Sequence, residues 1–245
     1  MMWTKAQNYL MKNNVIKEFI EKSNKQSNEY FFDYKLFGET EIFLLNPFVN
    51  DINLKVVLKK IESKIPKFYI YGLDAVYVGD FDFFRKNNTN ARYHDGSIHI
   101  SNDQDDEDDM VDDVVHEIAH HVENTYKFEI YSDGGLEKEF VNKRIYMESI
   151  LRNHDYKFNS ANFLDIEYSK EMDNFLYKDI GYEKLEILLS GLFIRPYAAT
   201  SLNEYFATGF EEYYLGDRND LKKISPRLYQ KFNDIDTMGY QNERA

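Results

Sequence analysis

The sequence predicts an α+β fold, with a small mixed sheet in the N-terminal half and a mainly helical C-terminal part. Between residues 30 and 101, short runs rich in aromatic and branched residues are separated by turn residues, as strands are. Beyond residue 114, apolar residues recur at the three- and four-residue spacing of helices. With 43% hydrophobic and 16% aromatic residues, the 245-residue chain can fill one large core, or a main domain with an appendage.

The first 65 residues are predicted to form a helical and strand segment, either packed on the main domain or part of it. Residues 3–22 have the pattern of an amphipathic helix, and residues 23–29 are polar and resemble a linker. Residues 30–48 contain two short strands, separated by Gly38, Glu39 and Thr40. Asp51 is expected to cap a helix that runs to Lys64 before Pro66, and this helix should bury Leu54, Val57, Leu58 and Ile61.

The main domain is predicted to cover residues 66–245. One or two strands are expected within residues 69–83, then a polar turn at 86–90 and a further strand over 91–101 with a turn at Asp95-Gly96. Within the last of these, Ser97–Ser101 is the candidate edge strand, either one that pairs with an extended peptide or an ordinary one. A helix over 137–151 should bury Phe140, Val141, Ile145 and Leu151, and shorter amphipathic stretches follow near 162–178 and 182–194.

The most informative motif is His-Glu-x-x-His at residues 116–120. On a helix, His116 and His120 project from one face, so that both imidazoles can hold a metal ion while Glu117 acts on a water molecule. The apolar residues around them predict a buried helix. Because the chain has no cysteine, zinc would be held by histidine and carboxylate alone.

A catalytic zinc needs a third protein ligand. Glu123 and Tyr126 occupy the positions where a metzincin has glycine and histidine, and the Gly-Thr-x-Asp signature of an aspzincin is absent. A glutamate on a later helix is the remaining source, and Glu204 in Ser201–Ala207 is the best-placed acid. The alternative is that Ser201 and Glu204 form only a capping box, in which case another acid would be the ligand.

Together these residues resemble the catalytic domain of the anthrax lethal factor and Pro-Pro endopeptidase family, over about residues 66–236. The resemblance rests on His116, Glu117 and His120, on Tyr197, and on Asn203–Ala207; the later Ile224–Tyr229 resembles the helix that closes that domain. It implies a zincin-like, gluzincin-type fold with an edge strand over the motif helix. It also implies that Tyr197, seven residues before Glu204, stabilises an oxyanion, although Tyr197 could simply pack after Pro196. The acidic residue that the family often has four positions after its ligand is Thr208 here, and Glu211 is a possible substitute.

The implied function is a zinc-dependent endopeptidase with one Zn²⁺ per chain, held by His116, His120 and Glu204, and with Glu117 as general base. The alternative is a weakly active or inactive zincin-fold binding module within a larger assembly or toxin. A third possibility is that the N-terminal segment docks the chain within a larger assembly, which would add to the peptidase function. His121 is expected to be structural, whereas His94 and His99 could line the cleft or be half-exposed on strands.

Charge and hydropathy limit the classes of partner that the chain can have. The net charge of −13 argues against nucleic acid, which leaves a protein or peptide as the expected substrate. The acidic run 103–113 lacks the glycine of a calcium loop and is expected to be a solvated loop. Its last members, Asp112 and Asp113, should favour the start of the next helix. A preference for basic substrates is a subsidiary expectation. Neither a signal peptide nor a membrane span is expected, which makes the cytoplasm, or delivery by another route, the default location.

Overall fold

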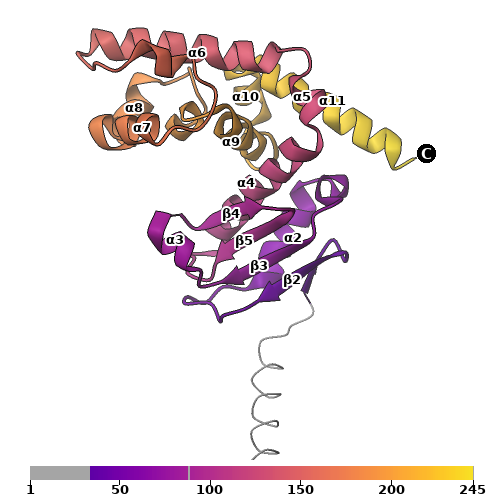
Figure 1. Ribbon diagram of the computed structural model, residues 1–245. Coiled ribbons are helices and arrows are strands. Elements are labelled where there is room, and N and C mark those ends of the chain that lie inside the picture. Colours follow the sequence, from indigo (N-terminus) through magenta and orange to yellow (C-terminus); the bar gives the residue numbers. More distant parts are fainter. Residues whose placement is uncertain (1–33, 88, 245) are drawn as a thin grey trace, which may run out of the picture.

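The computed structural model describes residues 34–87 and 89–244, which form a sheet layer and a helical layer joined by one long helix (Figure 1). The fold is α+β with a small mixed sheet, as the sequence predicts. The helix expected over residues 3–22 and the linker over 23–29 lie outside the described residues.

The sheet contains five strands in the order β1-β2-β3-β5-β4. These are β1 (Tyr34–Leu36), β2 (Thr40–Leu44), β3 (Ala75–Gly79), β4 (Ala91–His94) and β5 (Ser97–Ser101). The three central strands run parallel to one another, and β1 and β4 are antiparallel to their neighbours. Since β2 pairs directly with β3, the strands before residue 65 belong to the same sheet as the strands that follow.

The two edges of the sheet are β1 and β4, and the prediction that Ser97–Ser101 forms an edge strand is wrong. β4 and β5 make a hairpin whose turn lies at Asp95-Gly96, as expected, and both turn residues have positive φ (46° and 80°). β5 is interior because its other side pairs in parallel with β3. That pairing joins residues about twenty positions apart, so the local alternation of side chains does not reveal it.

One face of the sheet is covered by α2 (Leu54–Lys64) and α4 (Glu107–Thr125). Side chains from the two helices and the sheet meet in one apolar layer that includes Ile42, Val57, Val76, Val78, Met110 and Val114. The four residues predicted to face inward from α2 are all buried. Asp51 is not its cap, however, because the helix begins one residue after Asn53, whose side chain makes no capping bond.

Two further expectations for this half are only partly met. Within residues 69–90, only β3 is a strand. The 3₁₀ turn η1 (Lys67–Ile70) precedes it, so one of the one or two expected strands forms. Helix α3 (Asp82–Asn87) covers the end of the range 69–83 and the start of the polar turn expected at 86–90. The acidic run 103–113 is not all loop, since α4 already begins at Glu107. Asp106 caps it by accepting hydrogen bonds from the amides of Asp108 and Asp109 at 2.8 and 3.0 Å, and acidic residues in the first turn favour this start.

The helical layer is built around α9 (Leu202–Tyr214), which packs along α4 and is backed by α11 (Pro226–Asn242) (Figure 1). Its other helices are α5 (Lys127–Tyr131), α6 (Gly135–Asn153), α7 (Lys170–Asn174), the π-helical η3 (Phe175–Ile180), α8 (Tyr182–Leu188) and α10 (Arg218–Ile224), with 3₁₀ turns η2 (Ser160–Phe163) and η4 (Pro196–Ala199). The stretches expected near 162–178 and 182–194 are thus divided into short pieces. Among the described helices, none is long and apolar enough to cross a membrane.

The buried face of α6 differs from the predicted one. Phe140 and Leu151 are buried as expected, but Ile145 is 46% exposed. Lys143 and Arg144 are buried in its place, because each donates to carbonyl groups of the surrounding segments. Lys143 Nζ lies 2.5 Å from the carbonyl oxygen of residue 192 and 2.6 Å from that of residue 224, and the Arg144 guanidinium bonds to the carbonyls of residues 162 and 165.

Candidate metal centre

The two histidines of α4 lie side by side at the junction between the sheet and the helical layer. Their ring centroids are 4.9 Å apart, as expected for residues one turn apart on a single helix face. The other faces of α4 are anchored in the core by Val114, Val115, Ile118, Ala119 and Val122, all of them buried. The helix therefore presents both imidazoles from a fixed backbone.

Glu204 approaches the histidines from the first turn of α9. The hydroxyl of Ser201 caps this helix by accepting a hydrogen bond from the Glu204 amide at 3.2 Å, which is one half of the capping box considered from the sequence. The Glu204 carboxylate faces the other way, 3.0 Å from His116 Nε2 and 3.9 Å from His120 Nε2. Capping and ligation are therefore compatible, because the backbone amide serves the first and the side chain the second.

These three side chains fit a metal ion. Each offers one donor atom, and the three donor atoms lie within 4.8 Å of one another, close enough to surround a single cation. Two imidazole nitrogens and one carboxylate oxygen are the donor set of a class of catalytic zinc sites that keep a further position for water. Among the described residues, this is the group of histidine and acidic side chains that meets the spacing.

The charges around His116 favour a cation at this point. Burial lowers the pKa of His116, but the hydrogen bonds and negative charges of Glu204 and Glu211 outweigh it and raise that pKa well above its ordinary value. In the same way, burial raises the pKa of Glu204, whereas the neighbouring histidines lower it overall. The carboxylates thus hold a positive charge between them, which a divalent ion can supply in place of the proton.

A second carboxylate lies behind each histidine. Glu211, on α9, contacts His116 Nδ1 through Oε1, and its Oε2 lies 2.6 Å from Arg195 Nη1. Glu123, on α4, has Oε2 at 3.7 Å from His120 Nδ1. A carboxylate bonded to Nδ1 orients the ring and leaves Nε2 free for a metal, and Glu211 is the one of the two that is within hydrogen-bond distance. Thr208 is buried, and Glu211, the possible substitute considered from the sequence, lies behind His116.

Glu123 is held in turn by neutral donors. Asn203 Nδ2 lies 3.0 and 2.9 Å from its two carboxylate oxygens, and the Tyr131 hydroxyl also donates to it. Neither Glu123 nor Arg195 is among the residues proposed from the sequence. Glu123 lies one helical turn after His120, so helical spacing could have indicated it. Its partner Asn203 could have been found from its place directly before Glu204. No local pattern points to Arg195.

Glu117 lies beside the histidines, under the edge strand. It is buried, and its Oε2 accepts a hydrogen bond from the backbone amide of Tyr93 in β4. Burial raises the pKa of Glu117, and the nearby His120 and His116 only partly offset that effect. A carboxylate with a raised pKa is suited to accept a proton near neutral pH and to release it again.

Tyr197, in η4, reaches the same place from the helical layer. Its ring centroid is 6.4 Å from that of His116, and Tyr197 lines the same cavity as Glu204. Burial raises the pKa of Tyr197, and the charge of Glu204 adds to that shift, so the hydroxyl stays protonated and can donate. The Tyr182 ring packs edge-on against it at 6.2 Å.

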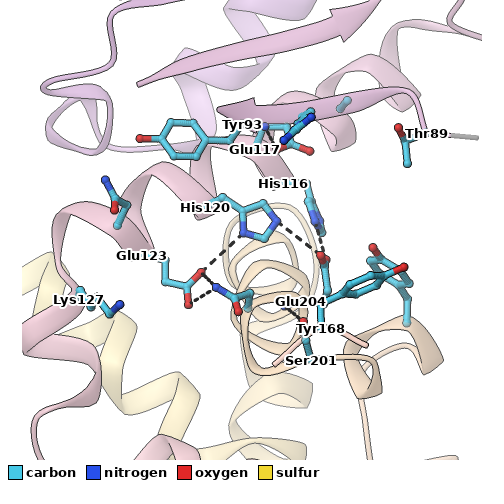
Figure 2. A pocket seen from close by; sticks show the side chains of 15 residues that line it. Thr89, Tyr93, His116, Glu117, His120, Glu123, Lys127, Tyr168, Ser201 and Glu204 are labelled. Carbon is cyan, nitrogen blue, oxygen red and sulfur yellow. Dashed lines mark hydrogen bonds and ion pairs between the residues drawn. The ribbon is translucent and has the colours of Figure 1, made fainter. Parts of the chain in front are cut away.

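These residues open into one cavity of about 690 Å³ (Figure 2). Ala91, Arg92 and Tyr93 of β4 line one side, and the start of α9 lines the other. Thr89 and Lys127 lie at opposite ends of the view, with His120 and Glu204 between them. The arrangement is a cleft in which the exposed edge of a strand runs past the candidate metal site.

The remaining histidines lie away from the cleft. His121 Nε2 donates to the carbonyl of Tyr71 at 3.0 Å and Nδ1 lies 3.3 Å from the Tyr93 hydroxyl, which agrees with a structural role. His99 stacks on Tyr77 on the sheet surface, and His94 is exposed beside Asp95. Neither lines the cavity.

Comparison of the chain with protein-family models, curated proteins and solved structures found no match.

Proposed function

We propose that this protein is a zinc-dependent endopeptidase with a zincin-like, gluzincin-type fold related to the anthrax lethal factor and Pro-Pro endopeptidase family. The observation that carries the proposal is the convergence of His116, His120 and Glu204 within 4.8 Å, with Glu117 in the same cleft. A merely structural metal site would not require a buried carboxylate beside its ligands.

In this proposal the three ligands hold one Zn²⁺ per chain. When bound, the ion would lower the pKa of a water molecule and polarise the substrate carbonyl. Glu117 accepts the proton of the attacking water and passes it to the leaving amine. The Tyr93 amide fixes one oxygen of Glu117, which leaves the other for this transfer. The Tyr197 hydroxyl, next to Glu204, donates to the developing oxyanion.

An extended peptide is the substrate that the cleft favours. β4 has one edge paired with β5 and the other turned toward the cleft, where a peptide can add as a further strand. The cavity extends past the candidate metal site on both sides, so a chain can pass through it rather than end in it (Figure 2). This supports cleavage within a chain.

The test is a diverse peptide library incubated with the zinc-loaded protein and analysed by mass spectrometry. Wild type should cleave a subset of peptides. Glu117→Gln should keep about one zinc per chain and lose cleavage, because an amide cannot accept the proton, and Glu204→Ala should lose both zinc and cleavage. Zinc binding without any cleavage by wild type would support the binding-module alternative and contradict the proposal.

A further inference from the structure

The ion pair between half-exposed Arg195 and buried Glu211 connects the candidate metal site to a surface outside the cleft. Glu211 is 3% exposed and lies two helical turns after Glu204 on α9. One helix therefore supplies both the candidate ligand Glu204 and the carboxylate behind His116. Arg195 comes from a different segment and directly precedes η4, which carries Tyr197. Its side chain is 48% exposed.

The two oxygens of Glu211 face different side chains, and the contact of Oε2 with Arg195 is an ion pair without a hydrogen bond. Oε1 contacts His116 Nδ1, and Oε2 lies 2.6 Å from Arg195 Nη1. A bond to Nδ1 keeps a proton on that nitrogen and leaves the lone pair of Nε2 directed at the metal site. A carboxylate this deeply buried is stabilised by a neighbouring cation, and Arg195 is the arginine or lysine that contacts Glu211 among the described residues.

We propose that Glu211 and Arg195 form a positioning pair that sets the affinity of His116 for the metal, with Arg195 acting through Glu211. This inference rests on the proposed metal site and adds to it a residue that does not line the catalytic cavity.

The two histidines differ in how the carboxylate behind each ring is held. Glu123 lies 3.7 Å from His120 Nδ1, beyond hydrogen-bond distance, and neutral groups of Asn203 and Tyr131 hold it. Glu211 contacts His116 directly and is held by a full charge. We therefore expect metal affinity to depend more on Glu211 than on Glu123.

The experiment measures the zinc dissociation constant by competition with a chromogenic chelator. Glu211→Gln should weaken zinc binding about 10- to 100-fold, as the loss of a carboxylate behind a ligating histidine does. Arg195→Met should weaken binding about 5- to 20-fold, and Arg195→Lys should recover part of that loss. The double variant should bind zinc within about threefold of Glu211→Gln alone, because Arg195 acts through Glu211.

Arg152→Met is the matched control. Arg152 is 49% exposed and pairs with Glu148 at 2.7 Å on α6, away from the cleft, so its removal should leave zinc affinity unchanged. The visible spectrum of the Co²⁺-substituted protein gives a second readout, since a tilted imidazole changes the ligand field. Arg195→Met should change that spectrum and Arg152→Met should not.

The possible outcomes separate the two proposals. If wild type binds zinc and Arg195→Met binds it equally well with an unchanged Co²⁺ spectrum, the positioning pair is refuted while the metal site stands. A double variant much weaker than Glu211→Gln would show that Arg195 acts on its own. If wild type binds no zinc, the metal site itself is wrong. Should Glu211→Gln fail to fold, Arg195→Met still decides, because its side chain is half-exposed.

Discussion

At the scale of single residues, contacts within the fold explain the positions of the side chains proposed to act in the cleft. Glu117 accepts a hydrogen bond from the amide of Tyr93, Glu204 faces His116, and the Tyr197 ring packs against Tyr182. Burial raises the cost of leaving any of these groups without a partner. The site is consequently held in place by its own residues before a substrate arrives.

Tyr197→Phe separates a role in catalysis from a role in metal binding. Removing the hydroxyl takes away one donor to the oxyanion, so kcat should fall about 100-fold. The zinc dissociation constant should stay within about threefold of wild type, since the ring can still pack against Tyr182. Steady-state kinetics and chelator competition measure the two quantities. An unchanged kcat would remove Tyr197 from the mechanism, and a large loss of zinc would assign it to orienting Glu204.

At the scale of elements, α4 combines an acidic start with a middle that carries the candidate metal ligands His116 and His120. Asp106 and its neighbours stabilise the first turn, whereas Asp113, further along, lies partly within the fold. Burial raises the pKa of Asp113 to about 6, and a hydrogen bond from Gln104 only partly offsets it. The folded protein therefore prefers this carboxyl protonated.

The pH dependence of stability follows from that preference. Because the folded-state pKa of Asp113 is above the usual value of 3.8, its stabilising contribution is complete below about pH 3.8 and disappears as pH rises through about 6. Asp113→Asn should accordingly raise the free energy of unfolding at pH 8 by about 1–2 kcal/mol, an advantage that vanishes near pH 4.

Urea denaturation of the metal-free protein at the two pH values measures this difference. Asp105→Asn is the control, since Asp105 belongs to the same acidic run and is exposed. Equal stability of Asp113→Asn and wild type at pH 8 would mean that ionised Asp113 is adequately solvated in the folded protein.

The contact between α9 and α11 depends on a glycine. A Cβ at Gly209 would lie 2.2 Å from Leu228 Cδ2 and 3.0 Å from its Cγ, and Leu228 is fully buried. Gly209→Ala should therefore push the helices apart and lower the free energy of unfolding by about 1–3 kcal/mol, despite the better helix propensity of alanine. Restoration of stability in Gly209→Ala/Leu228→Val would confirm the clash, and no loss in the single variant would contradict it.

At the scale of the whole molecule, local patterns predicted more of the site than of the fold. Helical spacing placed His116 and His120 on one face, and elimination of other ligand types left Glu204, which the structure brings to them. The identity of the edge strand depends on the pairing of β3 with β5, which is not local. The inner face of α6 was misjudged because Lys143 and Arg144 are buried on carbonyls from distant segments, which apolar periodicity does not register. Arg195 was missed for the same reason.

The central claim is that one zinc ion sits between α4 and α9. Crystals of the zinc-loaded protein, with anomalous diffraction measured on both sides of the zinc absorption edge, test it most directly. The account predicts a single zinc peak within about 2.0–2.2 Å of His116 Nε2, His120 Nε2 and a Glu204 carboxylate oxygen. A cleft without a zinc peak, or a zinc ion held by other residues while Glu204 only caps its helix, would contradict it.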